Sequence, residues 1–187
     1  MATARTSPVE IEVKLAVPSA PVARRLLAQA QFHISRRRAF ESNIVLDTPE
    51  RWLYNSGSLL RIRQASQRVT VTYKGPARPS KHKSREELEV EAGDAATLRR
   101  IFERLGFRPR FRYEKYRSEY RGQGSGIVTL DETPIGVYLE LEGPPRWIDR
   151  TAQRLGFAES DYITASYGRL YLEWCRNHHS KPGHMVF

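Results

Sequence analysis

Short segments between residues 9 and 142 alternate charged and apolar side chains with a period of two. In residues 9–17, Glu10, Glu12 and Lys14 alternate with valine, isoleucine and leucine, and the pattern recurs at Arg61 and Arg63. A period of two places alternate side chains on opposite faces of a β-strand. The chain must therefore form a sheet that has one apolar face and one charged face.

The charged face consists of carboxylates, guanidiniums and ammoniums, with few of the Ser, Thr and Gln residues that an ordinary solvent face contains. Its basic members are Lys14, Arg61, Arg63, Lys74, Arg85, Lys115 and Arg117. Its acidic members are Glu10, Glu12, Glu87, Glu89, Asp131, Glu140 and Glu142. A half-buried antiparallel sheet with one solvated face is the ordinary explanation for any one such strand. However, about eight strands suffice to close a barrel, so we expect an α+β fold in which an eight-stranded antiparallel β-barrel has helices packed outside.

One unit recurs along the chain: a strand with a Glu-x-Glu sequence leads into a helix that ends just before a phenylalanine. The second and third copies end in Leu-Gly-Phe, whereas the first has Gln31 in place of the glycine. Asp94 is placed to cap the second of these helices, and Gly106 to stop it. We expect one domain over 9–177, a flexible N-terminus over 1–8, a mobile basic loop over 75–83 and a loose tail over 178–187.

The chain has 31 Lys and Arg residues against 21 Asp and Glu, a formal net charge of +10. Such an excess attracts anions, which include nucleic acids, acidic membrane surfaces and small polyphosphates. The apolar residues form no long run, so we expect no membrane partner, and 1–8 lack the apolar stretch of a signal peptide. We therefore expect a cytoplasmic protein whose oligomeric state the sequence does not indicate.

The composition of the charged face favours a small polyphosphate over nucleic acid. Carboxylates two residues apart on a strand are hard oxygen donors that suit Mg²⁺ or Mn²⁺. Paired arginines bind phosphate oxygens in a bidentate manner. A triphosphate and two divalent cations would bring nearly balancing charges into a lumen that contains equal numbers of acids and bases.

These residues resemble the CYTH superfamily, the triphosphate tunnel metalloenzymes. The resemblance begins with Glu-x-Glu-x-Lys in the first strand and continues, in the family's order, through the other charged strands to residue 142. It implies a triphosphate tunnel that uses Mg²⁺ or Mn²⁺. By position, the resemblance assigns one metal to Glu10 and Glu12, a second to Asp131, Glu140 and Glu142, and phosphate to Lys14, Arg61, Arg63, Lys74, Arg85 and Arg117.

The resemblance also implies a catalytic residue and an activity. In some members a lysine at the position of Lys115 acts with a tyrosine of the second strand, but here Val45 stands at the position of that tyrosine. We therefore expect the metal to activate water for the hydrolysis of inorganic triphosphate, thiamine triphosphate or a nucleoside triphosphate. One alternative is a class IV adenylyl cyclase that converts ATP to cyclic AMP and pyrophosphate. Another is a non-catalytic binder of polyphosphate or nucleic acid that uses the outer basic residues Arg24, Arg25, Arg36, Arg37, Arg38, Arg99 and Arg100.

Overall fold

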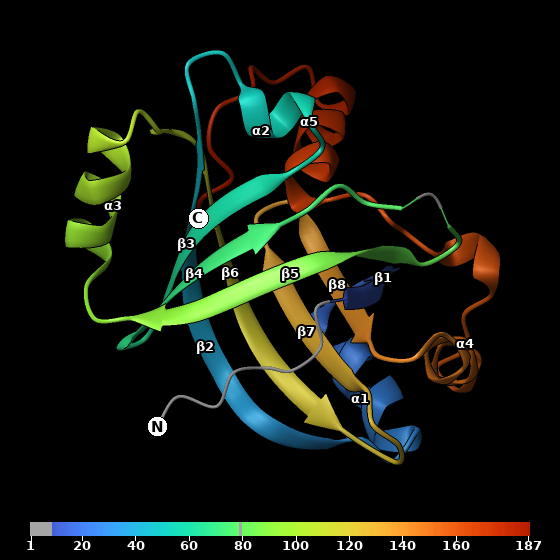
Figure 1. Ribbon diagram of the computed structural model, residues 1–187. Coiled ribbons are helices and arrows are strands. Elements are labelled where there is room, and N and C mark those ends of the chain that lie inside the picture. Colours follow the sequence, from blue (N-terminus) through green and yellow to red (C-terminus); the bar gives the residue numbers. More distant parts are fainter. Residues whose placement is uncertain (1–8, 79) are drawn as a thin grey trace.

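The predicted barrel is confirmed by a computed structural model, which describes residues 9–78 and 80–187 (Figure 1). In this part of the chain the strands are β1 (Val9–Val17), β2 (His33–Asp47), β3 (Leu59–Ala65), β4 (Arg68–Lys74), β5 (Lys83–Ala92), β6 (Arg108–Arg121), β7 (Ile127–Thr133) and β8 (Gly136–Glu142). They close in the order β1-β5-β4-β3-β2-β6-β7-β8, and every pair of neighbours is antiparallel. The N-terminus expected to be flexible lies outside the described residues.

Helices cover the outside of the barrel and one of its ends. They are α1 (Ala20–Gln29), α2 (Trp52–Asn55), α3 (Ala95–Arg104), α4 (Pro145–Arg154) and α5 (Tyr167–Asn177), with a short 3-10 turn at Glu159–Asp161. Helices α2 and α5 lie at the same end of the barrel, whereas α1 and α4 lie against its outer side (Figure 1). Within the described residues, no helix combines the length and apolar character that crossing a membrane requires.

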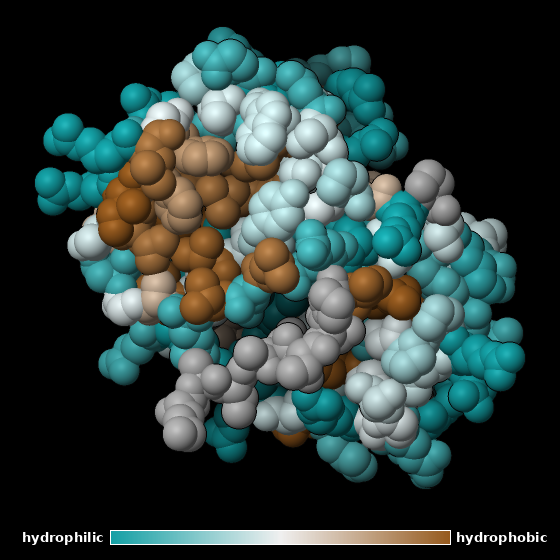
Figure 2. Space-filling view, in the orientation of Figure 1, coloured by the Kyte–Doolittle hydropathy of each residue, from teal (hydrophilic) through white to brown (hydrophobic). Residues whose placement is uncertain are grey.

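The barrel carries its apolar side chains outside and its charged side chains inside. On β1, Val13 and Leu15 are fully buried in an outer core beneath α1 and α4. Glu12 and Lys14, which alternate with these two residues, point into the lumen and are also buried. Near α3, some apolar side chains on the outside of the barrel are not covered by a helix, and Figure 2 shows an exposed apolar patch there.

The recurring helix endings have one shared backbone geometry. In each copy the phenylalanine N–H donates to the carbonyl five residues earlier, which is the Schellman arrangement that closes a helix. These bonds join Phe32 to Leu27, Phe107 to Phe102 and Phe157 to Ala152, at 2.9, 2.9 and 3.0 Å. The residue before each phenylalanine is left-handed: φ is 58° at Gln31, 96° at Gly106 and 87° at Gly156.

The substitution Gln31→Gly is expected to stabilise the protein. A left-handed conformation costs a residue with a side chain about 1–2 kcal/mol, a penalty that glycine escapes. Glycine also loses more backbone entropy on folding, so the expected net gain in the free energy of unfolding is roughly 0.5–1 kcal/mol. Denaturant titration checks this expectation; a loss of stability would show that the Gln31 side chain makes a compensating contact.

Residues 184–187 are docked against β6, whereas we expected a loose tail over 178–187. Met185 is only 1 % exposed, and its backbone bonds to Arg112 at 3.0 Å and to Glu114 at 2.8 Å on β6. The Met185 side chain packs in an aromatic cluster with Tyr113, Tyr167 and Tyr171. The apolar residues Met185, Val186 and Phe187 stand together after a polar stretch and give no periodic signal, so the sequence pattern did not reveal this contact.

Candidate functional site

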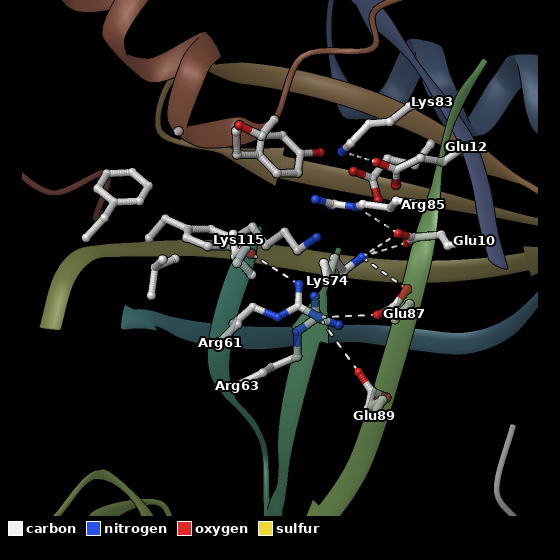
Figure 3. A pocket seen from close by; sticks show the side chains of 18 of the residues that line it. Glu10, Glu12, Arg61, Arg63, Lys74, Lys83, Arg85, Glu87, Glu89 and Lys115 are labelled. Carbon is white, nitrogen blue, oxygen red and sulfur yellow. Dashed lines mark hydrogen bonds and ion pairs between the residues drawn. The ribbon is translucent and has the colours of Figure 1, made fainter. Parts of the chain in front are cut away.

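The barrel encloses a cavity of about 910 Å³. It is lined by all the predicted charged residues except Asp131: Glu10, Glu12, Lys14, Arg61, Arg63, Lys74, Arg85, Glu87, Glu89, Lys115, Arg117, Glu140 and Glu142. The acids of β1 and β5 face the bases of β3 and β6 across this space (Figure 3). The strand alternation therefore does bring these side chains to one cavity.

Around β4 and β5 each acid contacts at least one base. Lys74 Nζ lies 2.6 Å from one carboxylate oxygen of Glu10 and 3.1 Å from Glu87. Arg85 Nε lies 3.5 Å from Glu10. Arg61 lies 3.7 Å from Glu89 and 3.9 Å from Glu87, distances that leave room for a ligand to compete for its guanidinium. Figure 3 shows these contacts as dashed lines.

Asp131 holds two bases of β6 and is itself completely buried. Its carboxylate has no exposed area and accepts from Lys115 at 2.8 Å and from Arg117 at 2.5 and 2.6 Å. The Tyr167 hydroxyl donates to the same carboxylate at 2.7 Å, and Arg117 also contacts Glu140. The structure thus encloses Asp131 among Lys115, Arg117 and Tyr167, and it does not bring this carboxylate to the cavity with the other predicted metal ligands.

Two lysines of the site meet at Glu12. Lys14 Nζ lies 3.2 Å from Glu12 and 3.1 Å from Glu140, and Lys83 Nζ lies 2.5 Å from Glu12. Burial alone would raise the pKa of Glu12, but Lys14 and Lys83 hold it well below the usual value. Glu12 is therefore ionised at neutral pH, with both lysines beside it.

Glu10 lies among other carboxylates of the cavity. Burial and the neighbouring Glu12 raise the pKa of Glu10 in spite of its contact with Lys74. Directly across the β1–β8 ladder, Glu12 also faces Glu142. Crowded carboxylates of this kind are hard oxygen donors, and a divalent cation would relieve their repulsion. The donor chemistry therefore fits Mg²⁺ or Mn²⁺.

Metal binding requires some ion pairs of the site to open. Within residues 9–78 and 80–187, no three Asp, Glu, His or Cys side chains are gathered as a ready metal site. Glu10 and Glu12 instead contact Lys74 and Lys83. A cation would have to replace these ammonium groups, which become free to turn toward an anion that enters with it.

The sequence pattern did not reveal Lys83, Glu41, Asn43 or Tyr113 as residues of the site. Lys83 lines the cavity and is 7 % exposed, although we expected it in a mobile loop. Extending the alternation of Arg85, Glu87 and Glu89 backward by two residues would have found it. Glu41 and Asn43 face inward from β2, and Nε of Arg63 lies 2.9 Å from the side-chain oxygen of Asn43. Their strand carries too few charges on this face for the pattern to be noticed.

Glu41 and Arg61 each keep an unused polar atom. Burial raises the pKa of Glu41, but Arg63, Lys115 and Arg117 outweigh it and lower the value to about 2. One carboxylate oxygen of Glu41 and Nε of Arg61 are nevertheless buried without a hydrogen-bond partner. Buried polar atoms are nearly always satisfied in folded proteins, so unsatisfied atoms beside a cavity are consistent with a site that binds a polar ligand.

Tyr113 is expected to ionise well below the usual tyrosine range. It lines the cavity, and its hydroxyl oxygen accepts from Arg61 at 3.3 Å. Burial raises its pKa, but the charges of Arg61, Arg63 and Lys115 outweigh burial and lower the pKa from 10.0 to about 8. Because the folded-state pKa is depressed, ionisation of Tyr113 stabilises the fold fully above pH 10, and this contribution is lost as the pH falls through about 8.

Ultraviolet difference absorbance of tyrosinate tests this prediction directly. One tyrosine should titrate near pH 8 in the wild-type protein, and this step should be missing in Tyr113→Phe. In Arg61→Ala the step should move upward, because a neighbouring positive charge is lost. An unchanged low step in Tyr113→Phe would assign it to another tyrosine.

Fold and cavity define a class of protein: closed antiparallel barrels whose lumen is lined by acids and bases. The CYTH domain family model matches residues 9–167, which is most of the chain. The chain therefore belongs to the CYTH family.

Particular relatives share much of this chain. A Methanocaldococcus jannaschii protein named "putative adenylate cyclase" is 30 % identical over 134 residues, covering 72 % of this chain and 76 % of that protein. A Pyrococcus horikoshii structure is similar with a TM-score of 0.74 and 27 % identity, over 88 % of this chain and 98 % of that chain. A Hippeastrum structure, described as a "putative adenylyl cyclase" with a dominant triphosphatase activity, gives a TM-score of 0.66 at 23 % identity, over 88 % of this chain and 95 % of that one.

Proposed function

We propose that the protein is a divalent-metal-dependent triphosphatase that hydrolyses a triphosphate compound inside the barrel. The observation that carries the proposal is the lining of the cavity, where buried bases and carboxylates form ion pairs with one another. Arg61, Lys74 and Lys83 are donors that suit phosphate oxygens, and Glu10 and Glu12 are ligands that suit the accompanying cations. The side chains of both sets are buried together.

Substrate binding would exchange partners without changing the net charge of the site. Lys74 and Lys83 would pass from Glu10 and Glu12 to phosphate oxygens, and the carboxylates would pass to the metal. Buried charges are costly unless they are paired, and this exchange keeps every charge paired. Arg61 and Arg63 extend the phosphate-binding surface along β3, and Lys14, Arg85 and Arg117 complete it.

The proposed metal ligands are Glu10 and Glu12 for one ion and Glu140 and Glu142 for another. Asp131 does not line the cavity, and it would join the second set only if its contacts with Lys115 and Arg117 opened. Bound there, Mg²⁺ or Mn²⁺ supplies polarisation of phosphoryl oxygens and neutralises charge that develops in the transition state. Because Asp131 is enclosed by Lys115, Arg117 and Tyr167, it serves this site first by orienting those bases.

Lys115 is the proposed catalytic residue. The residue is 1 % exposed, and its ammonium lies 2.8 Å from Asp131 and 5.1 Å from the centre of the Tyr167 ring. A fixed ammonium at the cavity wall can stabilise negative charge on a transferring phosphoryl group without reorganising during the reaction. Tyr113, two residues earlier on the same face of β6, adds a hydroxyl with a lowered pKa.

An adenylyl cyclase is the second candidate, and one feature of the cavity favours it. Tyr54, Phe111 and Tyr171 line the cavity near α2 and α5, where aromatic rings could stack on a base. The M. jannaschii relative is also named for this activity. In that reaction the ribose 3′-hydroxyl attacks the α-phosphate and pyrophosphate leaves.

Product analysis distinguishes these candidates. Purified protein is incubated with inorganic triphosphate, thiamine triphosphate or ATP, together with Mg²⁺ or Mn²⁺. Orthophosphate release supports the triphosphatase, whereas cyclic AMP with pyrophosphate supports the cyclase. No turnover of any substrate would contradict both and favour a non-catalytic binder that uses the outer arginines.

A further inference from the structure

The seam between β1 and β5 is the shortest ladder around the barrel in the described chain. Only four residue pairs join the two strands, from Val9 with Glu86 to Glu12 with Lys83. On the other side of β1, six pairs join it to β8. Lys83 and Glu12, which are in contact inside the cavity, therefore stand at the end of a short seam.

A cluster outside the barrel holds this seam. His82 is 4 % exposed, and its Nε2 lies 2.7 Å from a carboxylate oxygen of Asp149 on α4. The Tyr162 hydroxyl donates to the same oxygen at 3.0 Å, and its ring lies against the imidazole at a centroid distance of 5.9 Å. Lys81 reaches the other Asp149 oxygen at 3.0 Å. We call His82, Asp149 and Tyr162 the outer latch.

The outer latch is connected through the backbone to both lysines that meet at Glu12. Lys83 follows His82 directly, and its side chain enters the cavity on the opposite face of β5 (Figure 3). Ile163 follows Tyr162 directly, and it exchanges two backbone hydrogen bonds of 2.9 Å with Lys14. The outer latch thus fixes, from outside, the backbone positions from which Lys83 and Lys14 reach Glu12.

We propose that His82 is a positioning residue that holds Lys83 in place to bind the phosphate groups of the substrate. The inference rests on the proposed function, because it assumes that Lys83 passes from Glu12 to phosphate. Ordering the backbone at the start of β5 costs conformational entropy, and the outer latch meets this cost before the substrate binds. Apart from the outer latch, the described residues before β5 are held by backbone bonds of Arg78 with Ser84 and of Gly75 with Glu86, and by an exposed ion pair of Lys81 with Glu159.

The test measures binding rather than turnover. Calorimetry follows the titration of non-hydrolysable imidotriphosphate, in Mg²⁺ buffer, into the wild-type protein, His82→Ala, Lys83→Ala and the double variant. Loss of a charge-assisted contact should weaken binding by roughly tenfold or more in Lys83→Ala. His82→Ala should weaken binding nearly as much. The double variant should bind about as tightly as Lys83→Ala, because both substitutions remove the same interaction, that of Lys83 with phosphate.

A conservative variant and a control separate positioning from general damage. His82→Gln can place an amide N–H near the site of Nε2, so it should recover most of the affinity. His178→Ala removes an imidazole that stacks on Trp174 at 4.2 Å outside the cavity, and it should bind like the wild type. If His82→Ala does not fold, Asp149→Asn weakens the same latch with almost no change of shape and should give the same pattern.

The outcomes distinguish this inference from the proposed function. If the wild type binds imidotriphosphate and His82→Ala binds equally well, or if the effects of His82→Ala and Lys83→Ala add, the positioning role is overturned. If the wild type does not bind imidotriphosphate, the proposed function itself is overturned and the inference falls with it.

Discussion

The substitution Asp131→Asn is expected to lower the free energy of unfolding by about 3–5 kcal/mol, the range for removing one partner of a buried ion pair. The carboxylate is fully buried and accepts from Lys115, Arg117 and Tyr167. An asparagine of the same shape removes the negative charge and turns an amide donor toward these donors. The two cations would then be buried with too little compensation.

Thermal unfolding measures this effect, with Asp94→Asn as the matched control. A loss of this size lowers the melting temperature by on the order of 10 °C for a chain of this length. Asp94 caps α3 at the surface by accepting from Thr97, and asparagine is an equally good cap, so its substitution should change little. Equal melting temperatures for wild type and Asp131→Asn would show that Lys115 and Arg117 are compensated by other groups.

Glu140→Gln is expected to reduce triphosphate turnover by at least about a hundredfold, the upper range for disturbing the ligand set of a metal. The change keeps the side chain's shape and removes one charge from the proposed metal site. Stability should fall much less than in Asp131→Asn, because Lys14 keeps Glu12 and Arg117 keeps Asp131 as partners. The combination of a large loss of turnover and a small loss of stability is the expected result.

The measurement compares triphosphate turnover by Glu140→Gln, at saturating Mg²⁺ or Mn²⁺, with turnover by the control variant Glu103→Gln. In the wild type, the Glu103 carboxylate pairs with Arg99 on α3, outside the barrel. The control should retain wild-type turnover. Full activity in Glu140→Gln would place the metal elsewhere and remove Glu140 from the proposed ligand set.

The lumen residues were predictable because strand geometry leaves little freedom. Once Glu10 is assigned to one face, Glu12 and Lys14 must follow it, and the same holds for Glu140 and Glu142. The sequence also marked the helix ends, since Asp94 does cap α3 and Gly106 is left-handed after it. Even Gln31, which breaks the glycine pattern, adopts the same left-handed conformation.

The contacts among these residues were not predictable, because they depend on which strands become neighbours. Nothing local indicates that Asp131 is enclosed by Lys115 and Tyr167, which approach from β6 and α5. Likewise, His82 lies in a segment of basic and turn-forming residues that reads as solvated. Its partner Asp149 is 67 residues away on α4, so only the folded chain brings them together.

Arg61 is the residue that best tests whether the cavity binds a triphosphate together with a divalent metal. It is buried, its Nε has no hydrogen-bond partner, and its guanidinium lies more than 3.5 Å from the nearest carboxylates. Arg99 on the outer face of α3 provides a matched arginine control, since it pairs only with Glu103 among the contacts described for its side chain.

The decisive measurement is thermal unfolding of the wild type, Arg61→Ala and Arg99→Ala, each with and without Mg²⁺ and imidotriphosphate. At a hundred times the dissociation constant, binding should stabilise the wild type and Arg99→Ala by about 2.7 kcal/mol, and most of this gain should be lost in Arg61→Ala. Equal stabilisation of all three proteins, or of none, would contradict the claim that the barrel is a triphosphate-binding tunnel.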